Sequence, residues 1–147
     1  MDSRNKKLED RQAANRIVLH DGMNGAEMTT KTDDNDLVQR NCVPCRGDTL
    51  PLTGEAIQRL LKEVVVWKVV REHHLVKRFL FKDFKTALDF VNRVGELSER
   101  EWHHPDLSLA WGRVDIKIYT HKIDALSDND FILAAKIDHL YQEAPGR

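Results

Sequence analysis

Leu107-Ser-Leu-Ala-Trp-Gly-Arg-Val-Asp-Ile-Lys-Ile118 alternates large apolar residues with small or polar ones on both sides of a glycine. Such alternation is typical of half-buried β-strands, and a glycine between two strands favours a tight hairpin turn. With Gly112 and Arg113 as a two-residue loop, position 111 pairs with 114, 109 with 116 and 107 with 118. The apolar residues then share one face, so the stretch predicts an antiparallel hairpin with one buried side.

Three histidines flank this hairpin. The same ladder, extended outward, places His104 opposite His121, with Cβ atoms roughly 5 Å apart in a regular pair. His103 lies next to them in the chain. Pro105 cannot donate a ladder hydrogen bond, so we expect proximity rather than strict pairing. The sequence therefore predicts a cluster of three imidazoles at the end of the hairpin.

Clustered imidazoles suit proton transfer, because free histidine titrates at a pKa of about 6.5 and neighbours can act as base and acid at neutral pH. This favours elimination of water, isomerisation or tautomerisation. Three neutral imidazoles also suit zinc. However, His103 and His104 point to opposite faces of an extended strand, and binding one ion would need the backbone to bend at Pro105. We therefore expect acid–base chemistry without a metal, and a zinc-dependent lyase is the alternative.

Periodicity outside the hairpin predicts three helices and two further strands. Apolar residues recur at helical spacing over three segments: 54–63, 84–98 and a last helix after Ser127. β-Branched and aromatic residues mark strands over 64–70 and 75–81. The turn between these strands holds His73 and His74, which we expect to face water.

The helix starts carry capping residues. Thr53, Asp83 and Ser127 are the expected N-caps, and Asp130 stands three residues after Ser127, as in a capping box. The resulting order is α-β-β-α-β-β-α. This order predicts an α+β fold, in which a four-stranded antiparallel sheet has three helices packed on one face.

The 147 residues suffice for one domain with a substantial core. Residues 1–40 are polar and are predicted to be a disordered or loosely attached extension, followed by a single domain over 41–147. Charged residues make up 32% and the net charge is −1, which argues against nucleic-acid binding. No apolar run approaches the roughly 18 residues that cross a bilayer, and no apolar signal core is present, so we expect a cytoplasmic protein.

Cys42-Val-Pro-Cys45 is a CxxC pair, which can supply half of a zinc site or a redox couple. Zinc would need two more ligands, and the sequence has no second CxxC. A redox pair would stand at the start of a helix after a strand, whereas Arg-Gly-Asp-Thr-Leu-Pro follows here. We therefore expect structural or incidental cysteines in a reducing compartment.

Several separated residues together resemble one protein family, the pterin-4a-carbinolamine dehydratases. They are Glu99-x3-His103-His104-Pro105, Trp111, His121 and Asp130, with Phe81-Lys82-Asp83-Phe84 and Leu126-Ser127-x2-Asp130 as further marks. The resemblance covers about residues 45–142. Trp111 stands where many members carry Tyr, so a role for that phenol does not carry over.

The resemblance implies the same α-β-β-α-β-β-α fold and a hydro-lyase reaction. The substrate would be a 4a-hydroxytetrahydropterin, which loses water to give the quinonoid dihydropterin and so supports tetrahydrobiopterin recycling, without a metal or cofactor. It also implies an acid–base pair, His103 and His121, while His104 binds and orients the pterin.

Other residues are implicated because they lie next to these histidines. Candidates to line the pterin through backbone groups are Pro105, Thr120, Lys122 and Ile123. Glu99 and Asp130 could orient imidazoles, Trp111 completes the supporting set, and Asp130 is equally well explained as a helix cap.

Two expectations concern partners. The edge strands of such a small sheet are candidates for pairing between subunits, which favours a homodimer or homotetramer. Some vertebrate relatives are described as dimerisation cofactors for a transcription factor, so the alternative function is a non-catalytic interaction module. The intact histidine trio favours the enzyme.

Overall fold

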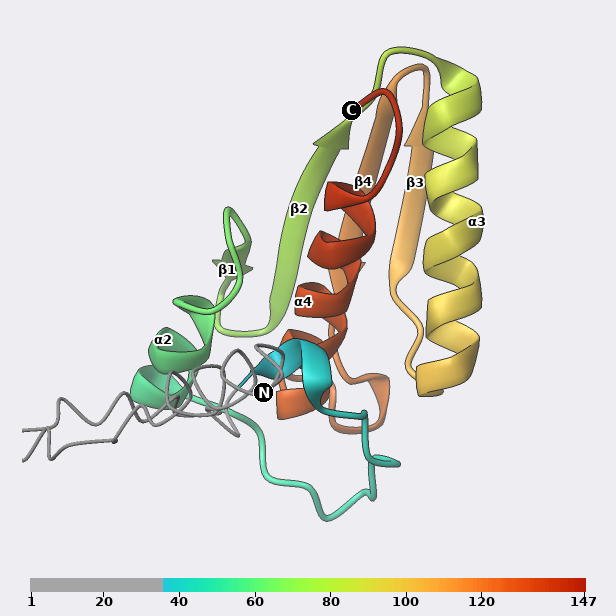
Figure 1. The fold of residues 1–147 in the computed structure, drawn as a ribbon. Coiled ribbons are helices and arrows are strands. Elements are labelled where there is room, and N and C mark those ends of the chain that lie inside the picture. Colours follow the sequence, from blue (N-terminus) through green and yellow to red (C-terminus); the bar gives the residue numbers. More distant parts are fainter. Residues whose placement is uncertain (1–35) are drawn as a thin grey trace, which may run out of the picture. The chain divides into compact units, whose positions relative to one another are not determined.

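The computed structural model describes residues 36–147 (Figure 1). The predicted extension over residues 1–40 therefore lies almost entirely outside the described residues. The described part opens with a short 3₁₀ helix, η1 (Leu37–Gln39), in which Leu37 is buried. Arg40 pairs with Asp128 at 3.0 Å, so the chain is already packed ahead of the domain boundary expected at residue 41.

Four strands form one antiparallel sheet in the order β1-β2-β4-β3: β1 (Lys68–Val70), β2 (His74–Leu80), β3 (Asp106–Ala110) and β4 (Arg113–Ile118). The α-helices are α2 (Gly54–Leu61), α3 (Phe84–Glu101) and α4 (Asp128–Gln142). A 3₁₀ helix, η2 (His121–Ile123), follows β4. The predicted α+β order is confirmed.

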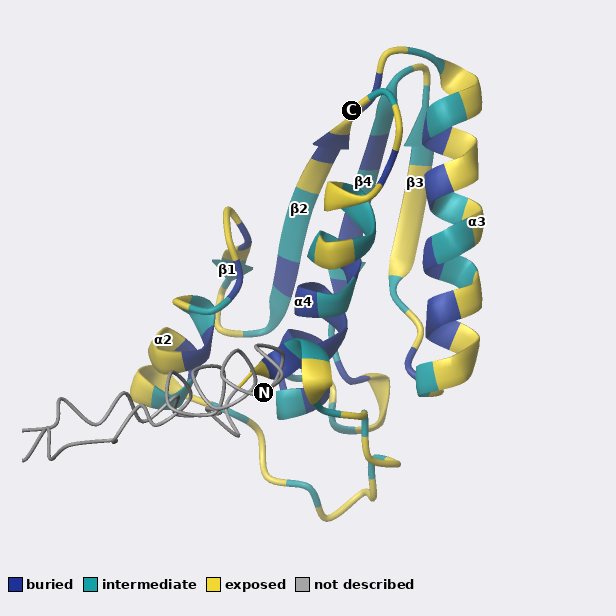
Figure 2. Ribbon diagram, in the orientation of Figure 1, coloured by how far each residue is buried: buried dark blue, intermediate teal, exposed yellow. Residues whose placement is uncertain are grey.

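All three α-helices share one hydrophobic core with the inner face of the sheet. Figure 1 shows α3 alongside β3 and α4 across β2 and β4, and Figure 2 shows buried residues on the sides that face each other. Phe79 of β2 packs against Phe90 of α3 and Tyr141 of α4, with ring centroids 5.1 and 4.9 Å away. Burying a side chain of this size stabilises the fold by roughly 1.5–3 kcal/mol.

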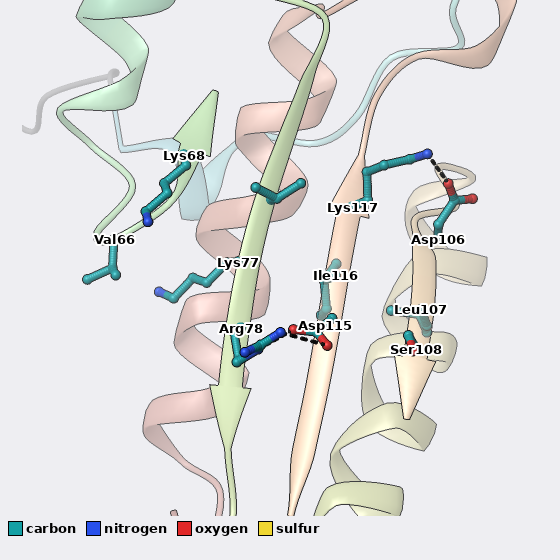
Figure 3. A pocket seen from close by; sticks show the side chains of 11 residues that line it. Val66, Lys68, Lys77, Arg78, Asp106, Leu107, Ser108, Asp115, Ile116 and Lys117 are labelled. Carbon is teal, nitrogen blue, oxygen red and sulfur yellow. Dashed lines mark hydrogen bonds and ion pairs between the residues drawn. The ribbon is translucent and has the colours of Figure 1, made fainter. Parts of the chain in front are cut away.

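The opposite face of the sheet carries paired charges, because alternate residues of each strand point away from the core. Arg78 of β2 pairs with Asp115 of β4 at 2.6 Å, and Lys117 of β4 pairs with Asp106 of β3 at 3.0 Å (Figure 3). A pocket of about 630 Å³ lies over this face.

The predicted hairpin exists, but its register differs by two residues. Leu109 pairs with Val114 and Leu107 with Ile116, so the two-residue loop is Trp111-Gly112. Gly112 adopts a φ of +59°, and a Cβ there would lie 2.7 Å from the Phe81 carbonyl oxygen. A shift of two residues leaves every side chain that stays in the strands on its predicted face, so alternation could not detect the error.

This register corrects the predicted place of Trp111. We expected it to share the apolar face of the hairpin, but it lies in the turn and is 75% exposed.

The strand predicted over 64–70 is also shorter than expected. Val64 is buried, whereas Val65 and Val66 form an exposed turn in which Val66 has a φ of 66°. The Lys77 ammonium donates to the Val65 carbonyl at 2.6 Å and to Asp138 at the same distance. β-Branched residues favour strands only where packing supports them, and here the turn is held from β2 and α4 instead.

Candidate active site

Two of the three histidines, His103 and His104, follow directly after the C-terminal end of α3. The helix runs three residues beyond its predicted end, to Glu101, and Trp102 ends it in the left-handed region. The Trp102 N–H donates to the Glu99 carbonyl at 3.4 Å, and the His103 N–H donates to the Ser98 carbonyl at 3.1 Å. This helix-ending turn reverses the chain and places His103 and His104 just ahead of β3.

His103 is held by a buried carboxylate. Its Nε2 lies 2.6 Å from Asp130 Oδ1, and the two residues are 8% and 0% exposed. The other carboxylate oxygen of Asp130 accepts from the Thr120 hydroxyl at 2.9 Å and from the Ser127 N–H at 2.7 Å. The predicted capping box of α4 is therefore present. Asp130 therefore caps the helix and also contacts an imidazole.

His104 and His121 are more exposed. His104 Nε2 lies 2.8 Å from Glu99 Oε1, so the carboxylate expected to orient an imidazole is in contact with one. His121 begins η2, and its Nε2 lies 3.9 Å from Asp106 Oδ1. Its ring also packs on Tyr119, with centroids 4.2 Å apart. Asp106 and Tyr119 contact the histidine cluster and were not anticipated.

One pocket of about 200 Å³ brings the three histidines together, although His121 reaches it through η2 rather than as a partner of His104 in the ladder. The lining residues are Pro44, Cys45, Trp102, His103, His104, Thr120, His121, Lys122 and Asn129. Thr120 and Lys122, two of the residues expected to line the pterin, are in the lining of this pocket. Pro105 and Ile123 are outside the lining, and Trp111 lies at the far end of β3.

The segment before α2 forms a wall of this pocket that sequence reasoning missed. The Lys122 ammonium donates to the Cys45 carbonyl at 2.9 Å. The side chain of Asn129 exchanges hydrogen bonds with the backbone of Val43, at 3.0 and 2.6 Å. The CxxC motif did mark this segment, but its cysteines were considered only for zinc or redox chemistry. In the structure backbone groups of the segment attach it to the site, and the Cys45 thiol also accepts a hydrogen bond from Asn129 Nδ2 at 3.1 Å.

The thiol of Cys42 shows little sign of reactivity. Both cysteines are free. Burial and the nearby Glu101 carboxylate raise the pKa of Cys42 to about 12, so this thiol stays protonated at neutral pH. Burial also acts to raise the pKa of Glu101, but hydrogen bonds from the Cys42 N–H and the Lys136 ammonium hold it below its ordinary value. The geometry supports a structural role for Cys42.

We expected His73 and His74 to face water, but both also contact other side chains. Their Nδ1 atoms lie 3.0 Å apart, and His73 Nε2 lies 3.0 Å from Asp124. The His73 ring also contacts Tyr119, with centroids 5.0 Å apart. Burial, with the neighbouring His73 and Lys117, lowers the pKa of His74. The turn between β1 and β2 is therefore fastened to the segment that carries His121.

The described chain offers neither a ready metal centre nor a membrane span. Within residues 36–147, no three or more His, Cys, Asp or Glu side chains are grouped so as to hold a metal ion. No helix in the same range is long and apolar enough to cross a membrane.

The histidine pocket, rather than the larger one on the open sheet face, has the chemistry of an active site. In the larger pocket Arg78 pairs with Asp115 and Lys117 pairs with Asp106, and no histidine of the described residues lines it (Figure 3). The fold and the histidine pocket define a class: small α+β proteins with a histidine-lined pocket at one end of an antiparallel sheet. Residues 50–140 match the family model described as Pterin 4 alpha carbinolamine dehydratase. The chain belongs to this family, which confirms the resemblance seen in the sequence.

Individual relatives agree with this assignment. A protein from Rubrobacter xylanophilus is 52% identical over 105 residues, which cover 71% of this chain and 98% of that protein. One from Alkaliphilus metalliredigens is 46% identical over 110 residues, or 74% and 99% of the two chains. Both are provisionally named pterin-4-alpha-carbinolamine dehydratases. The crystal structure of a transcriptional coactivator/pterin dehydratase from Brucella melitensis is similar, with a TM-score of 0.59 and 28% identity over 62% of this chain and 98% of that one.

Proposed function

We propose that this protein dehydrates a 4a-hydroxytetrahydropterin to the quinonoid dihydropterin and water by histidine acid–base catalysis. The observation that carries this proposal is the pocket shared by His103, His104 and His121 in a chain of this family. In the reaction the C4a–OH bond breaks, N5 loses its proton, and a C4a=N5 double bond forms. One group must accept a proton while another donates one, and two imidazoles at neutral pH can do both.

The hydrogen bonds indicate which nitrogens are available. A carboxylate only accepts, so Asp130 favours the His103 tautomer that carries hydrogen on Nε2 and leaves the Nδ1 lone pair free. Glu99 has the same effect on His104. The 3.9 Å separation between His121 and Asp106 is too long for a hydrogen bond. Of the three imidazoles, His121 is therefore the one that no carboxylate of the described residues holds by a hydrogen bond, which suits a group that protonates the departing hydroxyl.

We assign roles accordingly. His103 and His121 form the proton-transfer pair, and His104, which contacts Glu99, orients the pterin. Thr120 fixes Asp130 from the buried side, while Lys122 can contact the substrate from η2. The pathway we propose is recycling of tetrahydrobiopterin in the cytoplasm.

Catalysis is expected to need no metal. Enzyme treated with a chelator and then freed of it should dehydrate freshly generated 4a-hydroxytetrahydropterin at the rate of untreated enzyme, because proton transfer between imidazoles and substrate needs no Lewis acid. The measurement is the initial rate above the spontaneous rate, with a mock-treated sample as control. Loss of turnover that zinc restores would instead establish a zinc-dependent lyase.

A second candidate function is a non-catalytic interaction module. It is favoured by the similar Brucella protein, which is described as both a transcriptional coactivator and a pterin dehydratase. Turnover separates the two candidates, since an interaction module has no need to accelerate dehydration.

We also propose that the chain forms a homodimer or homotetramer. β3 is an edge strand of the sheet, so its outer backbone groups have no strand partner within the described residues. Light scattering on the purified protein should give twice or four times the mass of one chain at micromolar concentration. A monomer mass at that concentration would contradict the proposal.

A further inference from the structure

Trp102 stands where the backbone does not favour a tryptophan. The turn that ends α3 requires a left-handed residue, and Trp102 supplies it with a φ of 52°. Glycine adopts this conformation without steric cost, whereas a Cβ makes it unfavourable. The hydrogen bonds of the turn come from backbone N–H groups, which glycine would provide equally well. The backbone of the turn therefore does not explain why residue 102 is a tryptophan, and the contacts of its side chain must.

The side chain is not explained by packing within the domain. Trp102 is 74% exposed, so its indole contributes little to the core. It does line the histidine pocket, and its ring meets the His104 ring edge to face, with centroids 5.7 Å apart. A large apolar surface thus lies beside the imidazole that we assign to substrate orientation. Residues in strained conformations gather at functional sites, where the function compensates for the strain.

We propose that the Trp102 indole is a wall of the pocket against which the flat bicyclic ring of a pterin stacks. This inference rests on the proposed function and adds a residue that determines binding. Stacking acts on the ring rather than on the reacting C4a–O bond. Its contribution is therefore similar in the ground and transition states and should appear mainly in KM. The exposed edge of the indole would be covered by substrate.

Replacing Trp102 with Gly separates the backbone from the side chain. Trp102→Gly should raise the melting temperature because left-handed strain is relieved, yet raise KM about ten-fold or more through loss of stacking, with kcat changed little. Trp102→Phe should keep most of the affinity. The matched control is Val66→Gly: Val66 is also left-handed and apolar, is 71% exposed, and lies outside the histidine pocket. It should gain stability with KM unchanged.

Indole fluorescence supplies a readout that does not depend on turnover. Biopterin, a stable oxidised pterin, should quench part of the emission of the wild-type protein. Trp67 and Trp111 remain in Trp102→Phe, so the quenching lost in that variant reports on Trp102 alone. Equal quenching in both proteins, or an unchanged KM in Trp102→Gly, would overturn the inference.

The stacking wall and the dehydratase reaction can fail separately. Active wild-type enzyme with an unaffected Trp102→Gly variant overturns the stacking wall and leaves the dehydratase standing. Quenching that requires Trp102, in a protein that does not accelerate dehydration, supports the stacking wall while the proposed reaction fails.

Discussion

Gln at position 103 or 121 is expected to lower kcat by about 10²–10⁴-fold while the substrate still binds. Glutamine keeps some hydrogen-bonding capacity but cannot carry a proton at neutral pH, so it separates positioning from chemistry. His104→Gln should mainly raise KM, because an orienting hydrogen bond contributes in ground and transition states alike. Steady-state kinetics on the three single variants measure this division of roles.

Two controls sharpen the result. His139→Gln alters an exposed histidine of α4 that pairs with Glu143 at 3.4 Å, outside the pocket, and should leave both constants unchanged. The double variant of His103 and His121 should lose less activity than the product of the single losses, since the pair acts as a unit. Full kcat in His121→Gln would remove that residue from the chemistry.

Asp130→Ala should reduce the free energy of unfolding by about 3–5 kcal/mol. The carboxylate is fully buried and accepts from Thr120 and Ser127 while contacting His103. Removing it leaves those donors without their acceptor and opens the N-terminus of α4, and each buried unsatisfied group costs about 1–3 kcal/mol. Urea unfolding followed by circular dichroism measures the loss.

Asp128→Ala is the matched control, because that carboxylate lies two residues away but is half exposed and pairs only with Arg40 in the described structure. Its loss should be much smaller. Asp130→Asn should remain folded yet lose activity, since an amide cannot accept equally from all three partners and His103 is no longer held in one tautomer. Equal stability of the two alanine variants would show that Asp130 does not hold the site together.

Much of the fold follows from periodicity and capping. Asp83 and Ser127 precede their helices as expected, and the strand alternation places Val114, Ile116 and Ile118 in the core. These predictions depend on local rules, which tertiary contacts here reinforce.

The errors share a physical origin in contacts that sequence spacing does not encode. The turn of the hairpin packs on Phe81, just after β2: the Phe81 N–H donates to the Gly112 carbonyl at 2.8 Å, and a Cβ at Gly112 would clash with the Phe81 carbonyl. The turn at Val65 and Val66 depends on Lys77 of β2. The alternation of apolar and polar residues is the same for two registers that differ by two residues, so it could not distinguish between them.

The site could be predicted only in part, again because local sequence spacing does not encode contacts between distant segments. His103 and His104 stand just before the hairpin and His121 just after it, so the hairpin pattern predicted that they would meet, and a capping box revealed Asp130. The wall that includes Cys45 comes from a distant segment. It is attached through backbone groups and through the Cys45 thiol, and local sequence spacing does not encode these contacts. Trp102 could have been noticed only by knowing that its backbone is left-handed.

The most direct test of the proposed function is the rate at which freshly generated 4a-hydroxytetrahydropterin loses water with and without the purified full-length chain. The spontaneous reaction is measured in the same buffer, and a variant with Gln at 103, 104 and 121 controls for the protein itself. We predict that the wild-type chain accelerates dehydration in proportion to its concentration, with no metal added, and that the triple variant does not. A wild-type rate equal to the spontaneous rate would contradict the central claim.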